Sequence, residues 1–353
     1  MNIDQLLALG TQARASDIHI TVGVPPIFRI NGKLKSADMP QLMPQDTEDL
    51  VMQLLKDERK KEIFLREGEV DFSYGISSVG RFRVNVYKQR GTCAAALRAV
   101  TMNIPTLEEL GMPSVINELA RNTRGLVLVT GPTGSGKSTT LAAMIDEINR
   151  ERACHILTLE DPIEYLHKHN KSIVNQREIG ADTKSYASAL RSALREDPDV
   201  ILIGEMRDLE TISIAITAAE TGHFVLSTLH TIGAAQTVDR IIDVFPLHHQ
   251  EQIKIQLSNV LKGVISQQLI KRKDRSGRIV ATEIMVTTSA ISNLIREGKS
   301  HQIHSTIQTG SKHGMHTMDM SLAQLYKQGK IDIQDAIRYA QDQTNIKRLL
   351  GMP

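Results

Sequence analysis

The 353-residue sequence predicts an α/β protein that consists of two parts. Three observations support this prediction: a glycine-rich loop between a strand pattern and a helix pattern, an alternation of buried strands and helices after residue 125, and short alternating strands in the first hundred residues. A chain of this length exceeds one ordinary hydrophobic core, so two domains are the natural expectation.

The first hundred residues predict a small α+β domain with an antiparallel sheet. Alternating polar and apolar residues at 16–22 indicate a strand, and an Asn-Gly pair between apolar flanks at 27–34 indicates a hairpin. A helix is expected around 47–65. Three further strand patterns follow, at residues 70–74, 81–88 and 92–100.

The rest of the chain predicts a parallel sheet with helices on both faces. Buried strand patterns alternate with helical patterns, and they lie at residues 126–130, 155–159, 200–204 and 224–229. A hairpin made of residues 268–271 and 279–284 extends this sheet, and the pattern beyond residue 287 is helical. The expected segments are a domain at 1–100, a linker at 101–106, a core at 107–286 and a helical region at 287–353.

The composition argues against several classes of protein. Lys and Arg number 42 against 40 for Asp and Glu, and this balance gives no general attraction to nucleic acid or anionic membranes. Trp is absent and aromatic residues make up 3 %, which argues against stacking on single-stranded nucleic acid. No apolar run is long enough to span a membrane, and residues 1–5 do not resemble a signal peptide. Cys93 and Cys154 lack metal-site spacing, so we expect a reducing cytosol and no structural zinc.

The loop at residues 131–139 fits the phosphate-binding pattern G-x-x-x-x-G-K-[ST] in full, and the strand and helix patterns beside it argue against a chance match. Backbone N–H groups and the N-terminus of the following helix would bind the phosphates of ATP. Lys137 would reach the β- and γ-phosphates, and the Ser138 hydroxyl would bind Mg²⁺. The expected nucleotide-binding residues are Thr133, Gly134, Ser135, Gly136, Lys137, Ser138 and Thr139.

Carboxylates follow two of the core strands, at the edge where ligands of parallel sheets bind. Glu205 follows the strand 200–204, whereas Asp199 precedes it and should lie roughly 20 Å from the phosphates at ~3.3 Å per residue. We therefore expect Glu205, together with Ser138, near Mg²⁺. Glu164 is expected to orient or deprotonate the attacking water. The alternative is that these acids cap helices and turns.

Two histidines flank the strand 224–229. His230 ends it and should lie near the γ-phosphate, where it could sense bound triphosphate; His223 begins it and should lie at the far end. A structural hydrogen bond is the alternative role for either residue. The remaining histidine pairs lack the helical spacing of metal ligands and are expected at the surface: His167, His169, His248 and His249.

Arginines gather on one face of the predicted N-terminal sheet. Alternation places Arg81 and Arg83 on one face and the apolar residues between them on the other, while Arg98 lies on the following strand. Plain solvation would explain them in isolation. In a chain with a phosphate-binding loop, they are also candidates for arginine fingers that stabilise charge in phosphoryl transfer. The basic turn at 271–278 is expected to be solvated.

These motifs resemble those of the secretion ATPases of type II secretion and type IV pili, over nearly the whole chain. The matching segments are Walker A at 131–139, an acidic box at 160–164, Walker B at 197–208 and a histidine box at 221–231. The resemblance implies a PAS-like N-terminal domain, a RecA-like P-loop ATPase core with a helical C-terminal region, and a homohexamer. It also implies ATP bound between the domains, with Glu164 as the catalytic carboxylate and Arg81, Arg83 and Arg98 supplied by the neighbouring subunit. Spacing leaves open which arginine contacts phosphate.

Two features favour the branch of this family that retracts pili. Extension and type II motors usually carry an extra N-terminal domain and often a four-cysteine zinc site, for which this sequence shows neither room nor ligands. Residues 290–299 resemble the retraction signature A-I-R-N-L-I-R-E-G-K, although Ser292 replaces its first arginine. The resemblance implies an inner-membrane platform protein as partner, and a cytoplasmic protein held peripherally at the inner face of the cytoplasmic membrane.

Three alternatives stay open at this point. An extension or type II secretion motor shares the same boxes. A nucleic-acid translocase is disfavoured by the near-neutral charge and by the lack of stacking aromatics. A regulator that binds ATP without hydrolysing it is disfavoured by Lys137, Glu164 and Glu205.

Overall fold

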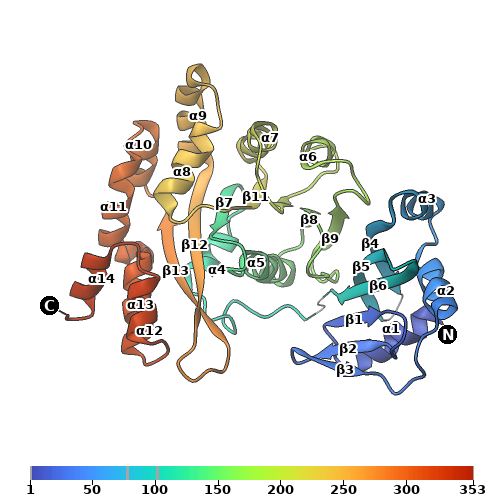
Figure 1. Ribbon diagram of the computed structural model, residues 1–353. Helices are drawn as coiled ribbons and strands as arrows, with labels where there is room; N and C mark the ends of the chain where they lie inside the picture. The colour runs from blue at the N-terminus through green and yellow to red at the C-terminus, as the bar shows by residue number, and fades with distance from the viewer. Residues whose placement is uncertain (1, 77–78, 101–102, 353) are drawn as a thin grey trace. The chain divides into compact units, whose positions relative to one another are not determined.

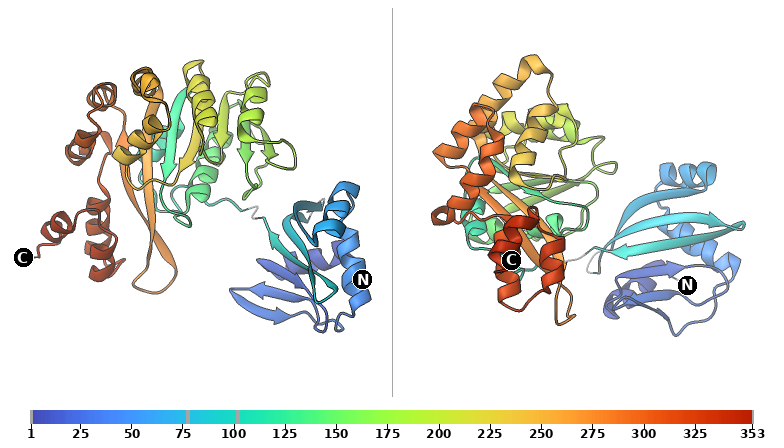
Figure 2. Two further views of the ribbon diagram at one scale, coloured as in Figure 1. Left: turned by 45° about the horizontal axis from the view of Figure 1, so that its top comes forward. Right: turned by 60° about the vertical axis from the view of Figure 1, so that its left-hand side comes forward.

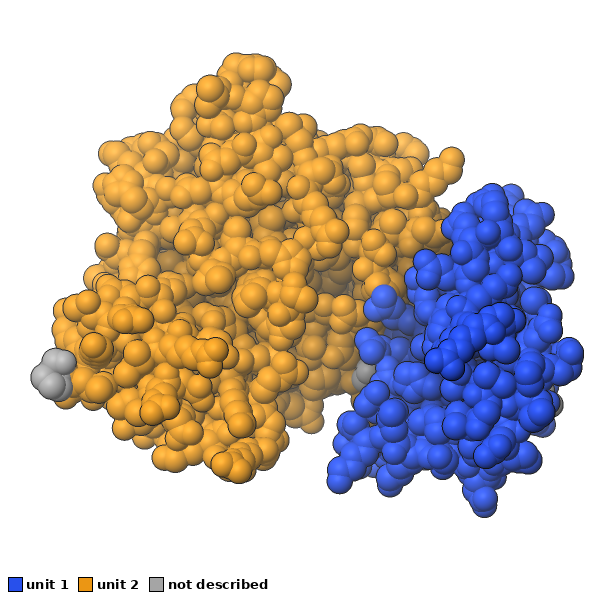
Figure 3. All heavy atoms as spheres, viewed as in Figure 1, with its two compact units in different colours: residues 1–102 blue, residues 103–353 orange. Residues whose placement is uncertain are grey.

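The computed structural model describes residues 2–76, 79–100 and 103–352 (Figure 1). Contacts divide the chain into two compact units, Met1–Met102 and Asn103–Pro353, which are coloured separately in Figure 3. Each unit has its own sheet and its own hydrophobic core, and the mixed α/β class is confirmed. The first two residues of the expected linker, 101 and 102, lie outside the described residues.

Unit 1 contains a six-stranded antiparallel sheet in the order β3-β2-β1-β6-β5-β4 (Figure 1). The strands are β1 (Asp17–Ile20), β2 (Ile27–Ile30), β3 (Lys33–Ser36), β4 (Glu69–Ile76), β5 (Gly80–Gln89) and β6 (Thr92–Ala99). Apolar side chains of α1 (Ile3–Gln12) and α2 (Pro44–Leu54) form one core with alternate residues of the strands. The other residues of those strands face away from this core, which is the reason for their polar character.

The helices of unit 1 differ from the expectation. The single helix expected at 47–65 is wrong: α2 ends at Leu54, and α3 (Glu58–Glu67) begins after Asp57. The Asp57 side chain accepts a hydrogen bond from the Arg59 N–H, so this aspartate starts a new helix rather than continuing the first. Helix α1 was not predicted, although its buried residues have helical spacing.

Unit 2 contains a seven-stranded sheet in the order β13-β12-β7-β11-β10-β8-β9. Neighbouring strands from β12 to β9 are parallel, and β13 is antiparallel to β12. The strands are β7 (Gly125–Thr130), β8 (His155–Glu160), β9 (Ile173–Glu178), β10 (Val200–Ile203), β11 (Phe224–Leu229), β12 (Leu261–Lys271) and β13 (Arg278–Val286).

Helices cover both faces of this sheet (Figures 1 and 2). One face packs against α4 (Val115–Ala120) and α5 (Lys137–Glu151). The other face packs against α6 (Tyr186–Ala193), α7 (Leu209–Glu220), α8 (Ala234–Asp243), α9 (Leu247–Val260), α10 (Ser289–Arg296) and α11 (Ile303–Thr309). A separate small core joins the far part of the β12–β13 hairpin to α12 (Met318–Lys327), α13 (Ile333–Arg338) and α14 (Gln343–Leu349). Within the described ranges, no helix has the length and apolar character needed to cross a membrane.

Two parts of the sheet were not predicted in full. Strand β9 was missed because its sequence, Ile-Val-Asn-Gln-Arg-Glu, lacks the apolar run of the inner strands and forms an edge of the sheet. Strand β12 begins at Leu261, well before the expected residue 268, because α9 passes into it with no glycine or proline at the boundary.

Candidate functional site

The glycine-rich loop joins β7 to α5 at the carboxyl edge of the sheet. Helix α5 begins at Lys137, and its N-cap residue, Gly136, has a φ of 91° and gives no side-chain cap. The first turn contains no acidic residue, so its N–H groups are available to an anion. Gly131 cannot be replaced by a larger residue, because a Cβ there would collide with the Gln267 carbonyl oxygen.

Gln267 of β12 fixes the loop from behind and was not predicted from the sequence. Its Nε2 donates to the Ser135 carbonyl oxygen (2.7 Å), and its Oε1 accepts from Thr140 Oγ1 (2.9 Å). Both bonds are buried, and Gln267 is 1 % exposed. A glutamine in a strand far along the sequence carries no motif signal, so only the fold reveals this contact.

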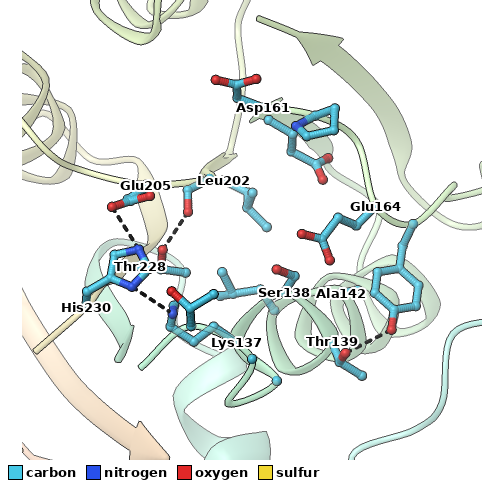
Figure 4. A pocket seen from close by; sticks show the side chains of 18 of the residues that line it. Lys137, Ser138, Thr139, Ala142, Asp161, Glu164, Leu202, Glu205, Thr228 and His230 are labelled. Carbon is cyan, nitrogen blue, oxygen red and sulfur yellow. Dashed lines mark hydrogen bonds and ion pairs between the residues drawn. The ribbon is translucent and has the colours of Figure 1, made fainter. Parts of the chain in front are cut away.

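A cavity of about 520 Å³ opens beside the loop (Figure 4). Of the predicted loop residues, Ser135 is buried behind the cavity, and those that line it are Thr133, Gly134, Gly136, Lys137, Ser138 and Thr139. Carboxylates and a histidine from the other boxes also line it: Glu160, Asp161, Glu164, Glu205 and His230. The carboxyl ends of β7, β8, β10 and β11 therefore bring the four sequence boxes to one place.

His230 links Lys137 to Glu205. Its Nε2 lies 3.0 Å from Glu205 Oε1, and its Nδ1 lies 3.4 Å from Lys137 Nζ. A neutral imidazole that donates from Nε2 and accepts at Nδ1 satisfies both neighbours. The other oxygen of Glu205 accepts from Arg207 Nη2 at 2.7 Å. Arg207 lies in the predicted Walker B segment, but its contact with Glu205 was not foreseen.

The electrostatics follow from these contacts. Burial lowers the pKa of Lys137, while the nearby charges of Glu205 and Glu164 oppose this shift. Partial burial alone would raise the pKa of Glu205, but the hydrogen bonds from Arg207 and His230 and the charge of Arg207 outweigh it and lower the pKa. Glu205 is therefore held as a carboxylate beside the lysine.

The segment after β8 places Glu164 on the opposite side of the cavity from His230 (Figure 4). Glu164 is exposed and points into the cavity near Ser138. The next residue, Tyr165, joins this segment to the phosphate loop, because its hydroxyl lies 2.9 Å from Thr139 Oγ1. Glu160 lies deeper in the protein than Glu164, and burial raises its pKa. Hydrogen bonds from Thr158 and Gln176 lower the pKa and so oppose part of this shift.

Asp199 and His223 lie at the other end of their strands and do not line the cavity. Asp199 Oδ2 accepts from the His155 N–H at 2.9 Å. His223 Nδ1 lies 3.0 Å from the Ala218 carbonyl oxygen. Both residues have local structural contacts, in agreement with the position rule that disfavoured them.

His167 was expected at the surface, and this was wrong. It lines the cavity, and burial lowers its pKa to about 4. The expectation failed because the segment after β8 folds back beside β9, where the Gln176 side chain accepts from the His167 N–H at 2.8 Å. Arg278 was assigned to a solvated turn; it is exposed but also lines the cavity, together with Leu269.

The arginines of unit 1 lie on the exposed side of its sheet. Phe82, like the other apolar residues of its face, is buried, and Arg83 stands directly opposite Arg98 in the β5–β6 register. Arg98 Nε donates to Asp17 Oδ1 at 2.9 Å, whereas Arg83 forms no ion pair with any residue of the described ranges. Arg81 is half-buried on the same strand. The residues that line the cavity all belong to unit 2.

The donor set suits a magnesium ion held mainly by a nucleotide. Mg²⁺ prefers oxygen ligands, and in nucleotide sites it takes few of them from the protein. Ser138 and Glu205 offer a hydroxyl and a carboxylate at the cavity. In the parts of the chain that the structure describes, no group of three His, Cys, Asp or Glu side chains could hold a metal by itself.

Comparison with known proteins decides the family. The family model described as type II/IV secretion system protein matches residues 2–338. The chain belongs to this family. It is 50 % identical to the type IV pilus retraction ATPase PilT of Pseudomonas aeruginosa over 336 residues, covering 95 % of this chain and 97 % of that protein. It is 49 % identical to a twitching motility protein of Neisseria gonorrhoeae, covering 93 % and 89 %.

A solved structure agrees with these sequence matches. The crystal structure of the pilus retraction motor PilT with bound ADP is similar with a TM-score of 0.90, at 50 % identity, and covers 99 % of each chain. This secretion-family chain is therefore an ATP-hydrolysing enzyme.

Proposed function

We propose that this protein is the ATP-driven motor that retracts type IV pili. The observation that carries the proposal is the cavity itself, where the phosphate loop meets Glu164, Glu205 and His230 in a chain similar to pilus retraction ATPases over nearly its full length. Unit 2 acts as a RecA-like core and unit 1 as a PAS-like domain. ATP hydrolysis would supply the free energy for the mechanical work.

The loop would bind the ATP phosphates through backbone N–H groups and the N-terminus of α5. Lys137 now bonds to the carbonyl oxygens of Gly131 (2.8 Å) and Pro132 (3.3 Å). A γ-phosphate would compete with these carbonyl oxygens for the Lys137 ammonium group. A shift of Lys137 would then alter its contact with His230 Nδ1. His230 is thus suited to sense whether triphosphate is bound.

Mg²⁺, when bound, would neutralise developing phosphate charge, and Ser138 and Glu205 are the residues proposed to hold it. Glu164 would orient the attacking water and accept its proton. Its position in the cavity supports this role, since it reaches the region of Ser138 without an ion pair to any described residue (Figure 4). The water oxygen would bond to the γ-phosphorus and lose a proton to Glu164, while the bond between that phosphorus and the departing ADP oxygen breaks.

The nucleobase would extend over the loop toward the β12–β13 hairpin. A second hollow of about 290 Å³ shares Gly136, Thr139, Leu269 and Arg278 with the main cavity. Leu110, Met112, Ile279 and Val280 provide apolar contacts there that suit a base, and polar residues such as Glu109 line the rest of the hollow. Arg278 stands where the two hollows meet and is proposed to contact the nucleotide there.

A homohexamer would let Arg81, Arg83 and Arg98 of one subunit complete the cavity of the next, as arginine fingers do in other phosphoryl-transfer enzymes. An inner-membrane platform protein would receive the motion, so the motor would work in the cytoplasm against the inner face of the cytoplasmic membrane. No nucleic acid and no zinc takes part in this scheme.

A deletion strain tests the direction of work. Cells without the protein should keep their surface pili, which electron microscopy would show. The same cells should lose twitching on agar. Wild type should restore twitching, whereas Lys137→Ala and Glu164→Gln should not, because the first loses the charge at the phosphates and the second loses the base. Purified Glu164→Gln should still bind ATP while its turnover falls. A deletion strain with no surface pili would assign the protein to pilus extension instead.

A further inference from the structure

Two buried side chains fasten the turn after His230 to the sheet. The Gly233 N–H donates to Ser266 Oγ (2.9 Å), and the Ala234 N–H donates to Glu283 Oε1 (2.8 Å). Ser266 and Glu283 are direct partners in the β12–β13 register. Helix α8 begins at Ala234 and receives no side-chain cap from its own N-cap residue. The two strands therefore supply the cap that α8 lacks.

Glu283 is an unusual residue to find at this place. It is 2 % exposed, and burying a carboxylate costs free energy unless the group is paired and hydrogen-bonded. Burial raises the pKa of Glu283, and the charge of Asp319 in α12 raises it further. The Ala234 N–H, the charge of His304 in α11 and the N–H of Met318 in α12 act in the opposite direction and lower it. Its Oε2 has no hydrogen bond of ordinary geometry to a described residue. It does not line the nucleotide cavity.

Further hydrogen bonds connect the turn that follows His230 to the start of α8. Thr231 Oγ1 lies 2.7 Å from Thr237 Oγ1, and Thr237 Oγ1 donates to the Gly233 carbonyl oxygen at 2.7 Å. The turn is thus bonded to the first turns of α8 as well as to the sheet. Fixing Gly233 and Ala234 restricts where His230 can lie.

We propose that Glu283 is a positioning residue for ATP hydrolysis, acting through His230. It holds the first turn of α8 on β13 and so keeps His230 between Glu205 and Lys137. This inference rests on the proposed function, since it requires that His230 takes part in hydrolysis.

A double-mutant cycle on the full-length protein tests the inference. Glu283→Gln keeps the shape and removes the charge; we expect kcat to fall about tenfold, as for a lost charge-assisted hydrogen bond, with the KM for ATP changed by less than about twofold. His230→Ala should lower kcat at least as much. The double variant should be no slower than His230→Ala alone, because residues that act as one unit are not additive. Losses that multiply would overturn the inference.

A matched control separates positioning from general damage to the fold. Asn149 near the end of α5 is also buried, and its side-chain oxygen accepts from the Asn170 N–H (3.2 Å) and the Ser172 N–H (3.3 Å), away from α8. Asn149→Ala should leave kcat within about twofold of wild type. An equal loss of kcat in Asn149→Ala would overturn the inference.

A milder variant covers the case in which Glu283→Gln does not fold. Ser266→Ala removes the acceptor at Gly233 and should lower kcat about threefold in the wild-type background but not in His230→Ala. The two proposals fail differently. Unchanged kcat in His230→Ala overturns the role of His230 and this inference with it. Loss of kcat in His230→Ala with unchanged kcat in both Glu283→Gln and Ser266→Ala overturns the positioning role alone.

Discussion

Lys137 shows how closely single side chains of the cavity depend on one another. Burial lowers its pKa, and the charges of Glu205 and Glu164 raise it. Removing either carboxylate charge would therefore lower the pKa of the lysine further. A variant such as Glu164→Gln changes the lysine as well as the proposed base, so nucleotide affinity should be measured together with turnover.

His167 gives a prediction about stability and pH. Its pKa is about 4 in the folded protein against an ordinary value of 6.5, so the folded state keeps it neutral. As pH falls below 6.5, the unfolded chain takes up a proton that the folded chain refuses. Stability is lost progressively from pH 6.5 down to about 4, by about 3 kcal/mol if the full shift applies.

The measurement is urea unfolding of wild type and His167→Gln between pH 7 and pH 4.5, without nucleotide. The unfolding free energy of wild type should fall more steeply, and the difference between the two proteins should shrink or reverse as the pH drops. His169→Gln, at an exposed neighbouring position, is the control and should follow wild type. Parallel curves for all three proteins would contradict the neutral state of the half-buried His167.

Helix α10 carries the segment that resembles the retraction signature, and its two sides have different roles. Ile291 and Ile295 are fully buried in the core of unit 2. Ser292, which replaces the first arginine of the signature, donates from its hydroxyl to the Ser258 carbonyl oxygen of α9 at 2.8 Å. Arg296 is exposed, and its guanidinium donates to Asn293 Oδ1 within its own helix, at 3.1 Å. The exposed side is therefore the one available to another component.

Arg296→Ala should uncouple the motor. Because the side chain is exposed, the ATPase rate and the unfolding free energy should stay close to wild type, while twitching of a complemented deletion strain is lost. The checks are ATPase assays on purified protein and twitching zones on agar.

Ile295→Ala is the matched contrast on the same helix. Deleting a buried isoleucine side chain should cost about 2–5 kcal/mol of stability, so both activities should fall together. Normal twitching by Arg296→Ala cells would remove this arginine from the coupling surface.

Inner strands of the core could be predicted because their sequences are continuously apolar. Strands β7, β10 and β11 are buried along their whole length, and their bounds agree with the prediction to within one residue. Edge strand β9 and the start of β12 could not be predicted, since pairing with a neighbour, not apolar pattern, defines them. The break between α2 and α3 depends on a single N-cap at Asp57, and the helix propensities of the surrounding residues do not reveal it.

The same limit applies to the site. The rule that ligands bind at the carboxyl ends of parallel strands selected Glu205 over Asp199 and His230 over His223, and the cavity is lined by the selected residues. Gln267 and Glu283 could not be predicted, because each forms a hydrogen bond with a backbone group that is far away in the sequence. Such contacts exist only once the β12–β13 hairpin has joined the sheet.

Completion of the site by a neighbouring subunit is a prediction about the whole molecule. Of the three arginines, Arg83 gives the clearest test, because Arg98 already forms an ion pair with Asp17 within its own subunit. Arg83→Ala and Lys137→Ala proteins should each be inactive. Mixed together, they should regain part of the ATPase rate, because some interfaces then combine an intact loop with an intact arginine. The measurement is an ATPase titration of one protein into the other, with subunit exchange verified by labelled protein.

Arg29→Ala is the control on the same sheet face. Arg29 Nε lies 3.6 Å from Asp17 Oδ2, so its loss removes a comparable charge without touching Arg83. Arg29→Ala should keep most of the ATPase activity. If exchange is complete and no mixing ratio restores activity, Arg83 does not act across an interface.

Gln267 and Gln268 stand next to each other in β12, and their side chains point to opposite faces of the strand. Gln267 binds the phosphate loop at Ser135, whereas Gln268 Nε2 donates to the Tyr339 carbonyl oxygen in the C-terminal helices, at 3.3 Å. A single-residue insertion or deletion upstream in this strand would exchange the two faces and break both contacts at once. Length variation during evolution should therefore be confined to the exposed turn beyond Lys271, where one more residue alters no register.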